Sequence, residues 1–95
     1  MAEPYLDLAV TYAVYAKNAL WHEADVGGYW GEVGIGEKNT NGAVRGMTNT
    51  MLGYAVLARA WNEGWLTPAM RAELSSAGLD RTGLLKHVRA NLEHI

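Results

Sequence analysis

The stretch that decides the fold is YLDLAVTYAVYAKNALW, residues 5–21. It is mostly Ala, Leu, Val and Tyr, and three of its polar residues, Asp7, Thr11 and Asn18, fall on one narrow stripe of a helix. Pro4 suits the first turn, where a missing N–H costs nothing. The pattern predicts a helix that ends near Trp21 or His22 and is apolar nearly all round.

Three more helices are expected further along the chain. A long one runs from about Ala43 to Asn62, and a short one through about Ser75 follows Thr67 as N-cap and Pro68 as first residue. Asp80 is expected to cap the last helix, with Leu79 and Leu84 as a hydrophobic staple. On this helix one face is expected to be apolar: Leu84, Leu85, Val88, Leu92 and Ile95. The sequence predicts an all-α fold of antiparallel helix hairpins.

The apolar character of the first two helices raises the question of what covers them. A chain of 95 residues makes one domain, 1–95, and buries only about 60 to 65 per cent of its unfolded surface when it folds alone. Helices that are apolar on all sides need neighbours on several sides. We therefore expect a homo-oligomer or a longer chain of which this is a segment, and a non-catalytic interaction module is one functional reading.

A long loop, His22 to Gly42, separates the first two long helices. Glycines at 27, 28, 31, 34, 36 and 42 break any helical period, and loops of this length are usually functional or disordered. Its aromatic residues Tyr29 and Trp30 stand between Gly28 and Gly31. Two interpretations stay open: these rings stack on a sugar, or they pack onto the core beneath the loop.

A donor-rich patch is expected where this loop enters the second helix. Arg45 and Asn49 lie one turn apart on one helix face, and Asn41 precedes them at the helix entrance. Such a patch at a helix N-terminus suits a carboxylate, a sulfate or a polyhydroxy ligand. The alternative is that Asn41 or Thr40 merely caps the helix and that Arg45 pairs with Glu32 or Glu37.

Other groups of ionisable residues give weaker indications of a functional site. His22, Glu23 and Asp25 match no metal-ligand spacing, so neither a metal site nor a cofactor is expected. Glu32 and Glu37 offer the two carboxylates of a glycoside hydrolase, provided that their separation suits that chemistry. In the last helix, the simplest reading of the polar-side residues His87 and His94 is that they are solvated.

Charge and composition bear on partners. Eight Lys and Arg against ten Asp and Glu give a formal charge of −2 with no basic run, which disfavours a nucleic-acid partner. The sequence shows no export signal and no apolar stretch of membrane-spanning length, so no membrane partner is expected. It contains no cysteine, and the compartment stays open.

The run from Gly28 to Ala58 resembles segments of the helical-toroid polysaccharide lyases, the heparinase-like and hyaluronate-lyase-like superfamily. The similar features are the Tyr29-Trp30-Gly31-Glu32-Val33-Gly34-Ile35-Gly36 segment and the Asn-Gly-x-x-Arg-Gly opening of the apolar helix. The resemblance covers about a third of the chain. Gly28 replaces an Asn of the family pattern, and no Tyr-His pair accompanies the patch.

The resemblance implies that the chain is a segment of an (α/α) toroid that binds or processes a polysaccharide, one containing uronate among the candidates. Asn41, Arg45 and Asn49 would then neutralise a uronate carboxylate, and Tyr29 and Trp30 would hold the glycan. Catalysis would come from a larger chain, as a lyase or a glycoside hydrolase.

Overall fold

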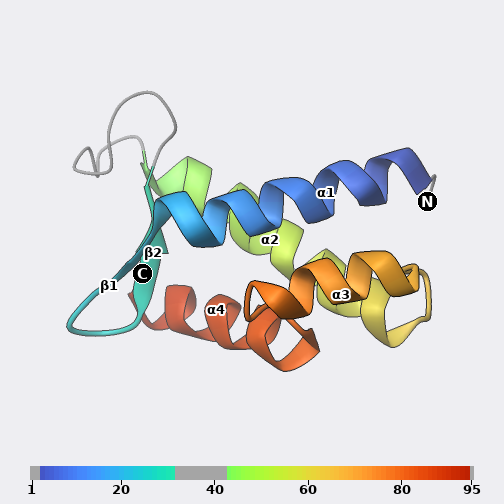
Figure 1. Cartoon of the computed structure of the whole chain (residues 1–95). Coiled ribbons are helices and arrows are strands. Elements are labelled where there is room, and N and C mark those ends of the chain that lie inside the picture. The colour runs from blue at the N-terminus through green and yellow to red at the C-terminus, as the bar shows by residue number, and fades with distance from the viewer. Residues whose placement is uncertain (1–2, 32–42, 95) are drawn as a thin grey trace.

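The computed structural model describes residues 3–31 and 43–94, which form four α-helices, one π-helical turn and a small β-hairpin (Figure 1). The helices are α1 (Glu3–Tyr15), α2 (Ala43–Asn62), α3 (Pro68–Ser76) and α4 (Arg81–His94). The π turn η1 (Ala16–Leu20) extends α1, and the strands are β1 (Trp21–Glu23) and β2 (Gly28–Trp30). Helices α1 and α2 run antiparallel to each other, and so do α2 and α4 (Figure 1).

The prediction of a mostly helical chain is confirmed, and so are its caps. Thr67 Oγ1 accepts a hydrogen bond from the backbone N–H of Met70 at 3.1 Å, with Pro68 as the first residue of α3. The backbone N–H of Gly83 donates to Asp80 Oδ1 at 2.8 Å. Each side chain satisfies a donor that the first turn of its helix leaves free.

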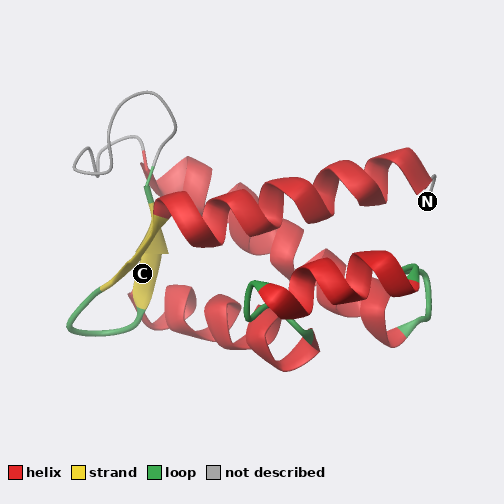
Figure 2. Ribbon diagram, in the orientation of Figure 1, coloured by secondary structure: helices red, strands yellow, loops and turns green. Residues whose placement is uncertain are grey.

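The loop from His22 was predicted without strands, and this part of the prediction is wrong. β1 and β2 pair antiparallel in the register Trp21–Trp30, His22–Tyr29 and Glu23–Gly28 (Figure 2). The turn closes with the N–H of Ala24 donating to the Gly27 carbonyl at 3.0 Å, and Gly27 takes a positive φ of 70°. Strands of three residues are too short to show the alternation by which a strand is recognised in a sequence.

Gly27 lets the hairpin lie closely against α4, and Gly28 leaves room for the Trp21 ring within the hairpin. A Cβ on Gly27 would come within 1.9 Å of the Ala90 carbonyl oxygen, and one on Gly28 within 2.2 Å of the Trp21 ring. Asn91, fully buried in α4, donates from Nδ2 to the Gly28 carbonyl at 3.0 Å. The hairpin is thereby fixed to the last helix.

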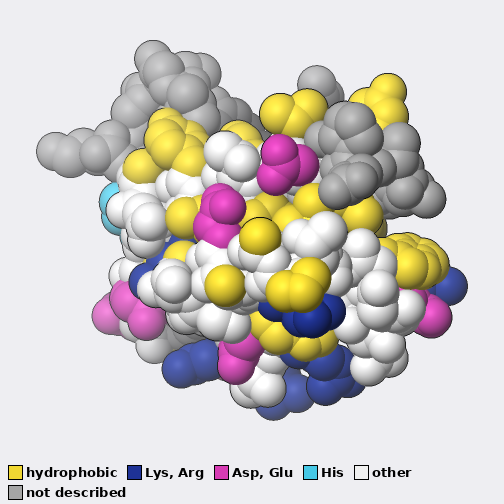
Figure 3. All heavy atoms as spheres, turned by 45° about the vertical axis from the view of Figure 1, so that its right-hand side comes forward, with side chains coloured by type: hydrophobic (Ala, Val, Ile, Leu, Met, Phe, Trp, Pro, Cys, Tyr) yellow, Lys and Arg dark blue, Asp and Glu magenta, His cyan; other side chains and the backbone are white. Residues whose placement is uncertain are grey.

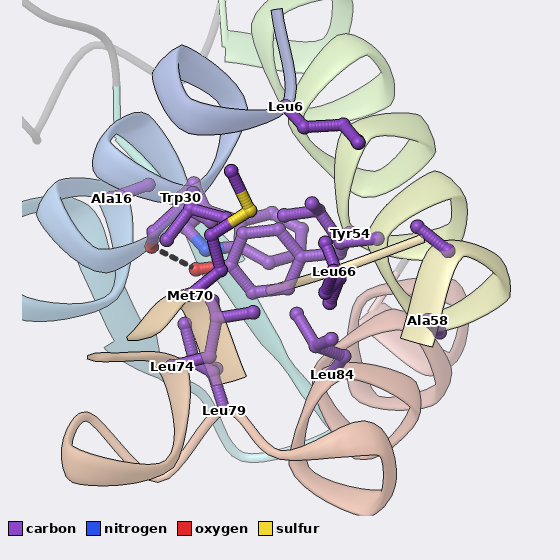
Figure 4. Close-up of a cluster of buried hydrophobic side chains, with 14 of the residues drawn as sticks. Leu6, Ala16, Trp30, Tyr54, Ala58, Leu66, Met70, Leu74, Leu79 and Leu84 are labelled. Carbon is purple, nitrogen blue, oxygen red and sulfur yellow. Dashed lines mark hydrogen bonds between the residues drawn. The ribbon is translucent and has the colours of Figure 1, made fainter. Parts of the chain in front are cut away.

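All four helices, η1 and strand β2 contribute side chains to the core (Figure 4). Trp30 and Tyr54 pack edge to face with their ring centroids 4.8 Å apart. Tyr54 also donates its hydroxyl proton to the Ala13 carbonyl at 2.7 Å, which ties α2 to α1. Burial raises the pKa of Tyr54. The nearby Trp30 lowers this pKa by a smaller amount, and Tyr12 adds a small raising effect. The Tyr54 hydroxyl therefore stays protonated and keeps this bond.

The face that α4 turns to the core agrees only in part with the predicted one: Leu84 and Val88 pack there as predicted, and Ile95 lies outside the described residues. Leu84 and Asn91 are buried, and His87 and Val88 are half-buried. These four positions lie on one face of the helix, three, four and seven residues apart from Leu84. Leu85 and Leu92, expected in the apolar face, are exposed. In the part of the chain that the structure describes, no helix has the length and apolarity needed to cross a membrane.

Candidate functional site

Trp30, expected as a stacking surface for a sugar, is part of the core. Its side chain is only 1% exposed and lies between Trp21 and Tyr54. Because the strand register directs Trp21 and Trp30 to the same face of the hairpin, both rings turn toward the helices. Of the two interpretations of Trp30, its position in the structure favours packing onto the core.

Tyr29 lies on the opposite face of the hairpin. Its half-buried ring is stacked between His22, at a centroid distance of 5.1 Å, and His94 of α4, at 5.0 Å. His94 is exposed, as expected, whereas His22 belongs to this stack rather than to a group of metal ligands. Among the described residues, no group of three His, Asp or Glu side chains could hold a metal ion.

The donor-rich patch is described only at Asn49. Asn41, Glu32 and Glu37 lie outside the described residues, and for Arg45 the structure describes the backbone of α2 alone. Asn49 is exposed and lines a cavity of about 350 Å³ between α1 and α2. Trp30 does not line this cavity, so the structure does not bring Asn49 and Trp30 together there.

This cavity is here called the α1–α2 groove, and several of the residues on its walls are small. Three of its lining residues, Ala9, Ala13 and Gly53, are small, and a Cβ built on Gly53 would meet nothing within 4 Å. The other lining residues are Tyr12, Asn49, Thr50, Tyr54 and Leu57. Small residues between two helices leave space for a group from outside to approach the backbone closely.

A row of large apolar side chains follows α1 beside this groove. Tyr5, Leu8, Tyr12 and Tyr15, here the α1 stripe, are 69%, 67%, 46% and 44% exposed. Tyr12 belongs both to the stripe and to the groove wall. On α2, Leu52 and Val56 are exposed next to the groove residues Gly53 and Leu57 in the sequence. Figure 3 shows apolar side chains along the upper edge of the molecule and others scattered over the same face.

A second cavity, of about 330 Å³, lies between η1, the hairpin and α4. It is here called the Lys17–His87 pocket. Its walls are formed by Lys17, Trp21, Glu23, Lys86, His87 and Ala90. No sequence pattern singled it out, because Lys17 and Lys86 are far apart in the chain, and the hairpin, which contacts both η1 and α4, brings them to one cavity.

His87 was expected to be solvated, and that prediction is wrong. Its ring packs against Trp21 with centroids 4.6 Å apart, and Nδ1 lies 2.8 Å from the Gly83 carbonyl oxygen. Since a carbonyl only accepts, Nδ1 carries the proton and Nε2 is the free acceptor of the neutral ring. Burial lowers the pKa of His87, against the raising effect of the Gly83 carbonyl. Weaker charge effects come from Lys17 and Lys86, which lower this pKa, and Glu23, which raises it.

Comparison with known proteins adds no relative: no family model, no curated protein and no solved structure matches the chain.

Proposed function

We propose that the chain is a non-catalytic helical interaction module that pairs with a second copy of itself through the α1 stripe and the α1–α2 groove. The observation that carries this proposal is the exposure of four large apolar side chains in one row of a surface helix. Contiguous exposed apolar surface of this kind marks interaction sites in folded proteins.

The spacing of the stripe fits a two-fold symmetric contact. Tyr5, Leu8, Tyr12 and Tyr15 are separated by three, four and three residues, which reads the same in both directions. Two such helices placed antiparallel, with the axis near Val10, bring Tyr5 opposite Tyr15 and Leu8 opposite Tyr12 of the other copy. The same surface patch then serves on both partners, as a two-fold interface requires.

Charge also favours a second copy as the partner. From Leu8 to Ala16 the helix contains no charged residue, so two copies can pair here without opposing like charges. An antiparallel arrangement also places the positive end of each helix dipole near the negative end of the other. A stable interface takes roughly 800 Å² from each partner, more than one stripe of a short helix offers. We therefore include the groove with Leu52 and Val56 in the contact.

Sedimentation velocity over a range of concentrations tests this function. We expect the wild-type chain to form dimers in the micromolar range, as is typical of modest apolar interfaces, and Tyr12→Glu to remain monomeric because it buries a charge at the contact. The matched control is Ala72→Glu, which adds the same charge at an exposed position of α3 and should leave dimerisation unchanged. A wild-type chain that stays monomeric to about 1 mM would exclude this function.

Glycan binding by a segment of a helical toroid is the second candidate, and one observation supports it. Asn49, an expected ligand residue, is exposed and lines the same groove as Tyr12. An amide and an aromatic face together suit the hydroxyls and the apolar face of a sugar ring. A uronate oligosaccharide should then bind in a manner lost in Asn49→Ala, and equal binding by both proteins would remove this candidate.

A further inference from the structure

The Lys17–His87 pocket gathers positive charge in a protein that is negative as a whole. The formal net charge is −2, yet two of the chain's three lysines, Lys17 and Lys86, line this one cavity. They come from different elements, η1 and α4. Lys17 lies in a π-helical turn, an irregularity that is frequent at functional sites because it displaces side chains from the ordinary helical positions.

The acidic residue of the pocket already has a partner. Glu23 Oε2 accepts a hydrogen bond from the Trp21 indole N–H at 3.1 Å. This bond uses part of the hydrogen-bonding capacity of the carboxylate, and because the indole is neutral it does not change the charge of the pocket. With His87 neutral, the two lysines and Glu23 leave the pocket with one excess positive charge.

His87 is held in a single orientation beside these charges. The contact of Nδ1 with the Gly83 carbonyl fixes the tautomer, and the packing against Trp21 fixes the ring plane. The ring can therefore accept a proton at Nε2 from an acidic ligand, or donate from Nε2 once it is protonated. The groups facing His87 from the elements around it are Lys17, Trp21, Glu23, Tyr54 and Lys86.

We propose that the Lys17–His87 pocket binds a phosphate group, either as inorganic phosphate or as a phosphate monoester. Two ammonium groups and one imidazole suit a tetrahedral anion, whose oxygens point in several directions and whose P–OH donates to a neutral Nε2. A planar carboxylate offers two oxygens and no such proton near neutral pH. The Trp21 side chain provides an apolar wall for the organic part of a monoester. The site is independent of the dimer contact proposed above.

An NMR titration of the complete chain with inorganic phosphate at constant ionic strength tests the proposal. We expect saturable shifts of the amides of Lys86 and His87 and of the His87 ring. Binding should be at least about tenfold weaker in the double variant Lys17→Gln/Lys86→Gln, since it loses two charge-assisted contacts. Arg89→Gln is the matched control, because Arg89 is exposed on the same helix and lines none of the cavities described above. Equal affinity in the double variant and the wild type would overturn the site.

The unmodified protein gives a second measurement that does not depend on how the variants fold. Bound phosphate should raise the pKa of His87, read from its ring resonances with and without phosphate. An unchanged pKa at saturating phosphate would overturn the proposal. Phenyl phosphate distinguishes the two sources: tighter binding than inorganic phosphate indicates a monoester, and equal binding indicates the free ion. Acetate that binds as strongly as phosphate would contradict the assignment of phosphate.

Discussion

At the scale of single residues, Trp30 distinguishes a structural role from a ligand-binding one. Its indole is buried between Trp21 and Tyr54, so Trp30→Ala should cost about 3–5 kcal/mol of unfolding free energy, measured by urea denaturation. Trp65→Ala is the control, because Trp65 is almost half exposed and should cost clearly less. Equal effects of the two substitutions would contradict the core position of Trp30.

His87 makes stability depend on pH. Because the pKa of the folded protein is lowered by burial, the unfolded chain takes up a proton here more readily than the folded one. The contribution of neutral His87 to the free energy of unfolding is fully present above the pKa of the unfolded chain, about 6.5. It is lost as the pH falls through the lower pKa of the folded protein. We expect thermal melts between pH 7.5 and 5 to show a smaller decline in His87→Gln than in the wild type. An equal decline would show that His87 is not involved.

At the scale of elements, the hairpin depends on its close contact with α4. Gly27→Ala meets both a positive φ and the Ala90 carbonyl, whereas Gly64→Ala meets a positive φ of 76° with nothing within 4 Å. The strained backbone alone costs about 1 kcal/mol, and the clash adds to it only in Gly27→Ala. Chemical denaturation should therefore show a larger loss for Gly27→Ala, and similar losses would mean that the hairpin does not lie against α4.

The helices could be predicted from the sequence where local chemistry determines them. The approximate bounds predicted for α2, Ala43 and Asn62, agree with the observed ones. The caps Thr67 and Asp80 were predicted because a helix start needs the same hydrogen-bond acceptors in any surroundings. The hairpin and the face of α4 depend on contacts between distant segments. His87 and Asn91 face inward because the hairpin offers them Trp21 and the Gly28 carbonyl, which no pattern within α4 indicates.

The candidate functional residues divide in the same way, into those placed by local sequence and those placed by contacts between distant segments. Asn49 was singled out from the sequence and does line a groove, because its place on α2 follows from the helical period alone. The Lys17–His87 pocket went unnoticed, since its residues come from η1, β1 and α4. The α1 stripe was predicted only in general terms: the first two helices have more apolar surface than the rest of the chain can cover.

At the scale of the whole molecule, the central claim is that two copies pair antiparallel through the α1 stripe. The chain contains no cysteine, so a single cysteine introduced on α1 or η1 accepts a spin label without side reactions. Thr11 lies next to the expected two-fold axis and Asn18 lies well away from it, and both are exposed.

The most direct test is the distance between the two labels of a dimer, measured by electron paramagnetic resonance for Thr11→Cys and for Asn18→Cys. Antiparallel pairing about Val10 predicts backbone separations of about 10 Å at position 11 and about 25 Å at position 18. Similar short distances at both positions would indicate parallel helices, and the absence of any distance between labels would show that this face does not pair; either result would contradict the claim.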